Sequence, residues 1–116
     1  MPKPSTKSSA KKTKNSNRRE SDGRESEGGW VTARFEIPNA SGLHARAAAV
    51  FVKVAKPFAA EIEIAKEGQI VNGKSILAVL MLGAEKGQTI EIRAKGLQAQ
   101  QALTSLGELI LAGFNE

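Results

Sequence analysis

The stretch from Val31 to Arg46 reads Val-Thr-Ala-Arg-Phe-Glu-Ile-Pro-Asn-Ala-Ser-Gly-Leu-His-Ala-Arg. Its first seven residues alternate between apolar and polar side chains, which predicts a strand with one buried face. Pro38 ends that strand, and the residues from Asn39 to Gly42 are typical of a loop. A helix is expected from Ala45 onward, which puts His44 at the helix N-terminus and Arg46 one step inside. Strand, loop and helix therefore converge on one histidine.

His44 is the only histidine in the chain. Imidazole is the side chain best suited at neutral pH to act as a nucleophile or base. A helix N-terminus offers open backbone N–H groups and the positive end of the helix dipole, and such a site commonly binds phosphate. A neutral imidazole, the Arg46 guanidinium and these amides would suit a phosphoryl group carried on the ring. The plainer interpretation, a histidine that only caps the helix or is partly buried, stays open on position alone.

A length of 116 residues favours one domain. Residues 1–29 carry eight basic and four acidic side chains and almost nothing apolar, whereas residues 30–116 carry nine basic and eight acidic ones. We therefore expect a disordered basic tail over residues 1–29 and a folded domain over residues 30–116. The tail could be a basic arm for nucleic acid or an anionic surface. The acidic residues that interrupt its basic run favour instead a solvated extension without a binding role, or a misassigned start codon.

The composition excludes several kinds of site. The chain has no cysteine, so disulfides and thiolate chemistry are excluded. One histidine without a cluster of other ligands argues against a metal site, and no cofactor is expected. No apolar run approaches the ~20 residues of a membrane span, and the N-terminus lacks the apolar part of a secretory signal. We expect a cytoplasmic protein that does not insert into membranes.

The rest of the folded part predicts the order β-α-β-β-α-β-α. Every predicted strand has one polar and one apolar face, which favours an α+β fold with a mainly antiparallel sheet covered by helices on one side. Ser75 is a good N-cap for the second helix, whose expected buried stripe is Ile76, Val79 and Leu80. The predicted strands are 31–37, 60–64, 69–72 and 88–94, and the predicted helices are 45–56, 76–82 and 98–112.

Two motifs of this core resemble the HPr family, the histidine-containing phosphocarriers of the bacterial phosphotransferase system, including its nitrogen-type paralogues. The first motif is Asn39-Ala-Ser-Gly-Leu-His-Ala-Arg46, and the second is Asn72-Gly-Lys-Ser-Ile-Leu-Ala-Val-Leu-Met-Leu-Gly83. Ser75 follows His44 by 31 positions, as in the family. The resemblance covers about residues 31–113. It implies an open-faced two-layer sandwich, with sheet order 1-4-2-3 and three helices on one face.

The resemblance also implies a function. His44 would accept a phosphoryl group on Nδ1 from enzyme I, which draws it from phosphoenolpyruvate, and would pass it to a IIA-type acceptor. Arg46 would neutralise charge on the transferring group, and the amides of Ala45 and Arg46 would hold phosphate oxygens. Such a protein is a monomeric carrier rather than an independent turnover enzyme. Its expected partner-docking surface is Ile76, Leu77, Leu80 and Met81.

One residue departs from the family pattern. The family usually has proline after the active-site arginine, where this chain has Ala47. Proline in the first turn of a helix fixes φ without losing an internal hydrogen bond, so Ala47 leaves the turn less rigid. No expected phosphate ligand is lost, and His44 is expected to remain competent.

Several alternatives stay open. Ser75 is explained as an N-cap by itself, but the resemblance also implies regulatory phosphorylation by an HPr kinase/phosphorylase. The chain could then be a regulatory module that acts by protein binding, although a pure binding module needs neither His44 nor Arg46. A small RNA-binding domain is a weaker hypothesis, since the outward strand positions considered carry no aromatic side chain, and nucleic acid is not expected as a partner. Sugar uptake and a nitrogen-type cascade are not separated.

Overall fold

The structure is a computed structural model and describes residues 24–25 and 29–116. The other residues of the expected tail, 1–23 and 26–28, lie outside the described part of the chain. The element order along the chain is β1 (Arg24–Glu25), β2 (Val31–Glu36), α1 (Ala45–Ala55), β3 (Glu61–Lys66), β4 (Gln69–Asn72), α2 (Ile76–Leu82), β5 (Thr89–Lys95), α3 (Ala99–Leu111) and a C-terminal turn, η2 (Gly113–Asn115).

The four predicted strands form one antiparallel sheet in the order β2-β5-β3-β4, which confirms the expected order 1-4-2-3. A fifth strand of two residues, β1, extends the sheet at the free edge of β2, where Arg24 pairs with Thr32 and Glu25 with Val31. This strand falls within the segment expected to be a disordered tail, and apolar patterning did not predict it. Strand pairing uses backbone hydrogen bonds, which need no apolar side chain.

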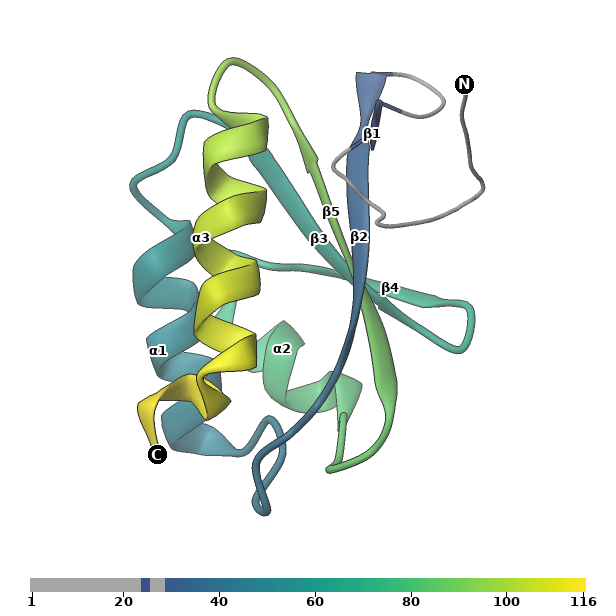
Figure 1. The fold of residues 1–116 in the computed structure, drawn as a ribbon, viewed down its shortest axis with the longest axis vertical. Coiled ribbons are helices and arrows are strands. Elements are labelled where there is room, and N and C mark those ends of the chain that lie inside the picture. Colours follow the sequence, from purple (N-terminus) through teal and green to yellow (C-terminus); the bar gives the residue numbers. More distant parts are fainter. Residues whose placement is uncertain (1–23, 26–28) are drawn as a thin grey trace.

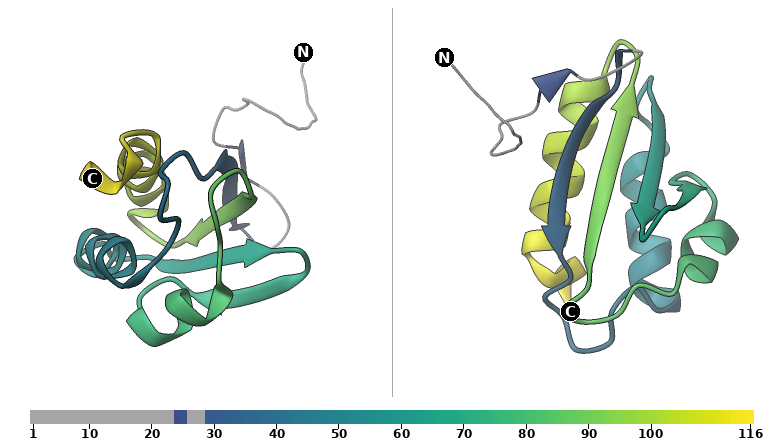
Figure 2. Two further views of the ribbon diagram at one scale, coloured as in Figure 1. Left: turned by 90° about the horizontal axis from the view of Figure 1, so that it is seen from below. Right: turned by 90° about the vertical axis from the view of Figure 1, so that its right-hand side faces the viewer.

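The molecule has two layers. Helices α1 and α3 lie side by side and antiparallel against one face of the sheet, with α2 next to them, and no helix of the described residues covers the other face (Figures 1 and 2). The core lies between these layers, and its largest fully buried side chains are Phe51, Phe114, Ile37, Ile64, Ile90, Ile92, Leu106, Ile110 and Val79. The predicted α+β sandwich is confirmed.

Helix α3 packs closely on β2 because it carries a glycine at the contact. A Cβ atom built on Gly107 would lie 2.8 Å from Cζ of Phe35, closer than side chains tolerate. The helix carries an apolar stripe that is buried against the core: Ala99, Ala102, Leu103, Leu106 and Ile110. Gly107 therefore brings the helix onto the aromatic ring, a requirement that hydrophobic periodicity does not reveal.

The buried side of α2 differs from the prediction. The structure buries Val79 and Leu82, whereas Ile76, expected inside, is 45% exposed and Leu80 is partly buried. Helix α2 packs mainly on α1 and β4 at the border of the helical layer, so its neighbours cover only a narrow strip of it. A seven-residue helix also has too few turns for its period to define which side faces inward.

The antiparallel arrangement of α1 and α3 decides what surrounds the histidine. Helix α1 begins at the end of the molecule where α3 finishes, and η2 contacts α1 (Figure 1). Phe114 in η2 is buried at 1% exposure and anchors the last residues in the core. Glu116, which is 72 positions after the histidine, thereby reaches its side chain.

Candidate functional site

His44 is the N-cap residue of α1, as expected. Its backbone is extended, and its carbonyl accepts the first hydrogen bond of the helix, from the Ala48 amide, at 2.8 Å. The amides of Ala45, Arg46 and Ala47 precede that bond and have no partner within the helix, which is the general condition of a first helical turn. The imidazole therefore stands beside a group of N–H donors directed out of the helix end.

The two ring nitrogens of His44 have different partners. Nδ1 accepts from the backbone amide of Arg46 at 3.3 Å, and Nε2 lies against Oε2 of Glu116. Since a carboxylate only accepts hydrogen bonds, its partner nitrogen Nε2 carries the ring proton. Nδ1 is then the nitrogen with the lone pair, and the ring side chain is 36% exposed. The geometry thus favours an unprotonated Nδ1 at the helix N-terminus.

The Glu116 carboxylate is held at both oxygens. Oε2 meets the His44 ring, while Oε1 accepts from Nδ2 of Asn39 at 3.0 Å. The hydrogen bonds from His44 and then from Asn39, together with the charges of His44 and Arg46, hold the pKa of Glu116 below its ordinary value of 4.5. The carboxylate is consequently ionised at neutral pH and can balance positive charge on the ring.

The loop before His44 is set by a close approach between two backbones. Gly42 has φ +65°, and a Cβ atom there would lie 2.6 Å from the carbonyl oxygen of Ala84. The next amide, that of Leu43, donates to that oxygen at 2.9 Å. Only glycine combines this left-handed backbone with so near a neighbour. The segment after α2 thus supports the loop that delivers His44.

Arg46 and Ala47 lie one and two residues inside α1. Arg46 is exposed, and its positive charge lies near enough to Glu116 to contribute to the lowered pKa of that carboxyl. Ala47 is fully buried at 0% exposure and packs in the core. The side chain at the family's usual proline position is therefore part of the helix packing.

Ser75 and the expected docking residues lie on α2. The Ser75 hydroxyl accepts from the Ala78 amide at 3.2 Å, so the expected N-cap is confirmed. Leu77 is 68% and Met81 71% exposed, and together with the half-exposed Ile76 they form an apolar surface. The far end of α2 adjoins the loop of His44 through Ala84, whereas Ser75 lies one helix length away, about 10 Å.

No pattern in the sequence indicates a role for Asn39, Glu116 or Phe114. Asn39 stood within the first motif, but nothing in the motif indicates what its amide contacts. Glu116 is 72 positions from His44 and belongs to no pattern that sequence periodicity can detect. Only the packing of α3 beside α1 brings these side chains together.

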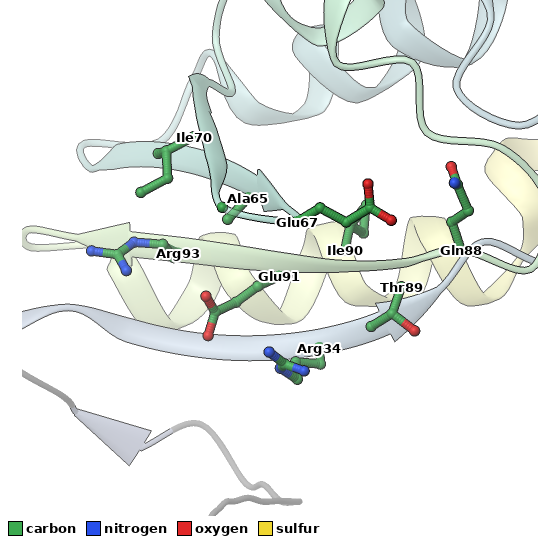
Figure 3. A pocket seen from close by; sticks show the side chains of 10 residues that line it. Arg34, Ala65, Glu67, Ile70, Gln88, Thr89, Ile90, Glu91 and Arg93 are labelled. Carbon is green, nitrogen blue, oxygen red and sulfur yellow. The ribbon is translucent and has the colours of Figure 1, made fainter.

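The face of the sheet opposite the helices holds an open groove of about 480 Å³ lined by residues of β2, β3, β4 and β5 (Figure 3). Its charged side chains balance, with Arg34 and Arg93 against Glu67 and Glu91. The groove therefore favours neither an anion nor a cation, and none of its lining residues belongs to the loop of His44.

Trp30 places an aromatic ring on this face. The outward strand positions on which the sequence prediction relied include no aromatic residue, because Trp30 precedes the first predicted strand. The ring centroid lies 5.0 Å from the Arg93 guanidinium carbon and 5.7 Å from Nζ of Lys95. Arg93 also bonds Glu63 at 3.2 Å. The ring is thus engaged in cation–π contacts with two neighbours on β5.

The described residues contain neither a cluster of metal-ligating side chains nor a helix suited to cross a membrane. No group of three or more His, Cys, Asp or Glu side chains in that part of the chain could hold a metal ion. None of the helices described there has the length and apolar character needed to span a membrane.

Comparison with known proteins gives concordant results. Residues 31–112 match the family described as "PTS HPr component phosphorylation site". The chain is 42% identical over 82 residues to the phosphocarrier protein HPr of Neisseria meningitidis serogroup A, covering 71% of this chain and 92% of that protein. A crystal structure of HPr from Thermoanaerobacter tengcongensis superimposes with a TM-score of 0.71 at 38% identity, covering 73% of this chain and 96% of that one.

A longer relative also matches. The chain is 41% identical over 88 residues to the multiphosphoryl transfer protein of Vibrio cholerae, covering 73% of this chain. It spans only 22% of the length of that relative. The same domain thus occurs as a small protein and as a part of a larger one.

Proposed function

This chain belongs to the HPr family of the phosphotransferase system, and we propose that it carries the phosphoryl group on Nδ1 of His44. The group would come from enzyme I charged by phosphoenolpyruvate and would pass to a IIA-type acceptor. Phosphoryl carriage is the role of the family. The observation that supports His44 as the carrier is its ring geometry, with Nε2 on a carboxylate and Nδ1 beside the open amides of a helix N-terminus.

The chemical step uses the lone pair of Nδ1. It attacks phosphorus, an Nδ1–P bond forms, and the bond between phosphorus and the donor breaks, with its electron pair leaving on the donor. The ring keeps the proton on Nε2 and becomes cationic. Glu116 faces that proton and offsets the new charge, in the way that a buried aspartate supports a catalytic histidine in serine proteases.

The incoming group is stabilised by the helix end. The Arg46 amide already points at Nδ1 from 3.3 Å, so a short shift lets it donate to a phosphoryl oxygen. The Ala45 amide and the exposed Arg46 guanidinium add two further donors. Phosphoryl transfer asks a protein mainly for positioning and for neutralisation of charge, and these groups supply both.

The apolar surface of Ile76, Leu77, Leu80 and Met81 is proposed as the place where the donor and the acceptor dock. It adjoins the His44 loop through the segment at Ala84, so a partner seated there reaches the ring. We propose that one surface serves both partners in turn, because the phosphoryl group must enter and leave at the same nitrogen.

The test is phosphorylation in vitro. The full chain is mixed with enzyme I and labelled phosphoenolpyruvate, and His44→Ala is the control. The expected label is stable to base, labile to acid, and absent from the variant, because an N–P bond has that lability. Transfer of the label to a IIA protein would establish the second half of the cycle. Labelling that persists in His44→Ala would refute the assignment.

A second function, regulation by phosphorylation of Ser75, rests on the position of that hydroxyl. Ser75 caps α2 and directly precedes the exposed Ile76 and Leu77, so a phosphate there would place charge beside the proposed docking surface. An HPr kinase/phosphorylase with ATP would then label the wild type and not Ser75→Ala. A wild-type chain left unlabelled by an active kinase would exclude this regulation.

A further inference from the structure

We propose that Asn39 is a positioning residue for phosphoryl transfer: its amide holds the Glu116 carboxylate against Nε2 of His44 and thereby keeps Nδ1 the unprotonated ring nitrogen. The proposal rests on Nδ1 being the proposed carrier atom. Among the described residues, the hydrogen bonds of Asn39 go to Gly42 and Glu116 and not to the His44 ring, so it acts on the ring through Glu116.

The contacts of the Asn39 amide group support this role. Nδ2 donates to the carbonyl oxygen of Gly42 at 2.9 Å and to Oε1 of Glu116 at 3.0 Å, which uses both of its hydrogens. The first bond ties Asn39 to the loop that delivers His44. The second ties it to a carboxylate 77 positions away. One planar group therefore sets the distance between the loop and Glu116.

The burial of Asn39 indicates that these two bonds matter. The residue is only 9% exposed, and its Oδ1 atom has no hydrogen-bond partner among the described residues. An unsatisfied buried carbonyl destabilises the fold, and an apolar side chain of the same size would avoid that cost. The amide at this position is therefore explained by its N–H groups, which only a donor side chain can supply.

The backbone before Glu116 does not fix the carboxylate by itself. Gly113, Phe114 and Asn115 all have left-handed φ values, +67°, +59° and +63°, so the chain turns sharply around the buried Phe114 ring. This turn brings residue 116 near His44. The Glu116 side chain still has three rotatable bonds, and Asn39 selects the conformation in which Oε2 faces the ring.

Burial of Asn39 also allows a purely structural role, in which its bond to Gly42 shapes the loop. The two roles separate in a double-mutant cycle with Asn39→Ala and Glu116→Ala. If Asn39 acts through Glu116, the two single variants change the His44 ring equally and the double variant adds nothing. If Asn39 only shapes the loop, its replacement changes the ring as much without Glu116 as with it.

The readout is the protonation of the ring itself, measured on the unphosphorylated, ¹⁵N-labelled full chain by long-range ¹H–¹⁵N spectra at a pH where the ring is neutral. The wild type should show the proton on Nε2. Asn39→Ala and Glu116→Ala should both lose part of that preference, by the same amount. A ring whose tautomer is unchanged in Asn39→Ala, or an Asn39→Ala effect that persists in the Glu116→Ala background, overturns the proposal.

Two features keep this test decisive. Asn39→Asp has the shape of asparagine but donates no hydrogen bond and repels Glu116, so it should lose at least as much of the Nε2 preference as alanine; retention of the wild-type tautomer would contradict the proposal even if Asn39→Ala failed to fold. The measurement also needs no partner protein. A tautomer shift without labelling by enzyme I would defeat the proposed function and leave Asn39 as the residue that orients the ring.

Discussion

A carboxylate oxygen of Glu116 contacts Nε2 of His44, although the two residues are 72 positions apart. The contact links Glu116 to the start of α1. It also gives the two nitrogens of the His44 ring different roles, with the proton on Nε2 and the lone pair on Nδ1. The atom that would bind phosphorus is left free of its proton, while the opposite atom faces a negative charge. The histidine at this helix N-terminus thereby presents the unprotonated nitrogen that a nucleophile requires.

The Glu116 contact predicts a pH-dependent stability. The pKa of this carboxyl is lowered on folding, so its ionised form stabilises the folded chain above 4.5, and that contribution is lost as the pH falls through the lowered pKa. Urea unfolding of the wild type and Glu116→Gln should give a difference in free energy that is largest above pH 4.5 and shrinks below it. A difference that stays constant down to pH 3 would contradict the assignment.

Replacement of Arg46 tests charge neutralisation. Arg46→Ala should lower kcat/KM for phosphorylation by enzyme I by about a hundredfold, the scale seen when one donor to a developing anion is removed. Arg46→Lys should recover part of this loss, because lysine keeps the charge but not the planar fork. The matched control is Lys53→Ala, an exposed cation on the same helix. Equal losses in both alanine variants would indicate a general charge effect.

Ala47→Pro restores the residue that the family usually has. Position 47 precedes the first intrahelical hydrogen bond, which is donated by Ala48, so proline removes no helix bond there. Because proline lowers the conformational entropy of the unfolded chain, Ala47→Pro should raise the free energy of unfolding by about 0.4–1 kcal/mol, measured by thermal or urea unfolding. Destabilisation would mean instead that the packing around this fully buried position has no room for the ring.

Gly42→Ala should be strongly destabilising. Alanine meets both a left-handed φ and a contact of 2.6 Å with the Ala84 carbonyl, and we expect a loss of about 2–4 kcal/mol in urea unfolding. Gly68→Ala is the matched control, since φ is +84° there but no atom lies within 4 Å of the added Cβ. It should lose only the conformational part, about 1–2 kcal/mol. Equal losses would show that the close approach to Ala84 is unimportant.

Ser75→Ala removes the cap of α2. The Ala78 amide loses its partner, and the free energy of unfolding should fall by about 1 kcal/mol. Ser41→Ala, at an exposed serine of the His44 loop, should change it by less than about 0.5 kcal/mol. Labelling of His44 by enzyme I should be unaffected in Ser75→Ala, and a loss of label there would place Ser75 in the transfer reaction.

Much of the fold was predictable because its signals are local. Alternating residues in Val31–Glu36 and an apolar stripe in Ala99–Leu111 each report which side of one element is buried. The wrong prediction for Ile76 also comes from reliance on a local pattern. A helix of two turns has too few residues for their spacing to distinguish a buried side from a docking surface. Strand β1 was not predicted because it pairs through backbone hydrogen bonds, which do not depend on a pattern of apolar side chains.

The sequence by itself determined the four longer strands and the three α-helices, the helix cap at His44, the serine cap of α2 and, through two motifs, the family. The tertiary structure decided what surrounds the ring. Asn39 and Glu116 meet there because α3 returns antiparallel to α1 and the buried Phe114 turns the last residues back toward the loop. Contacts between distant segments depend on how whole elements pack, and no local pattern of side chains records that geometry.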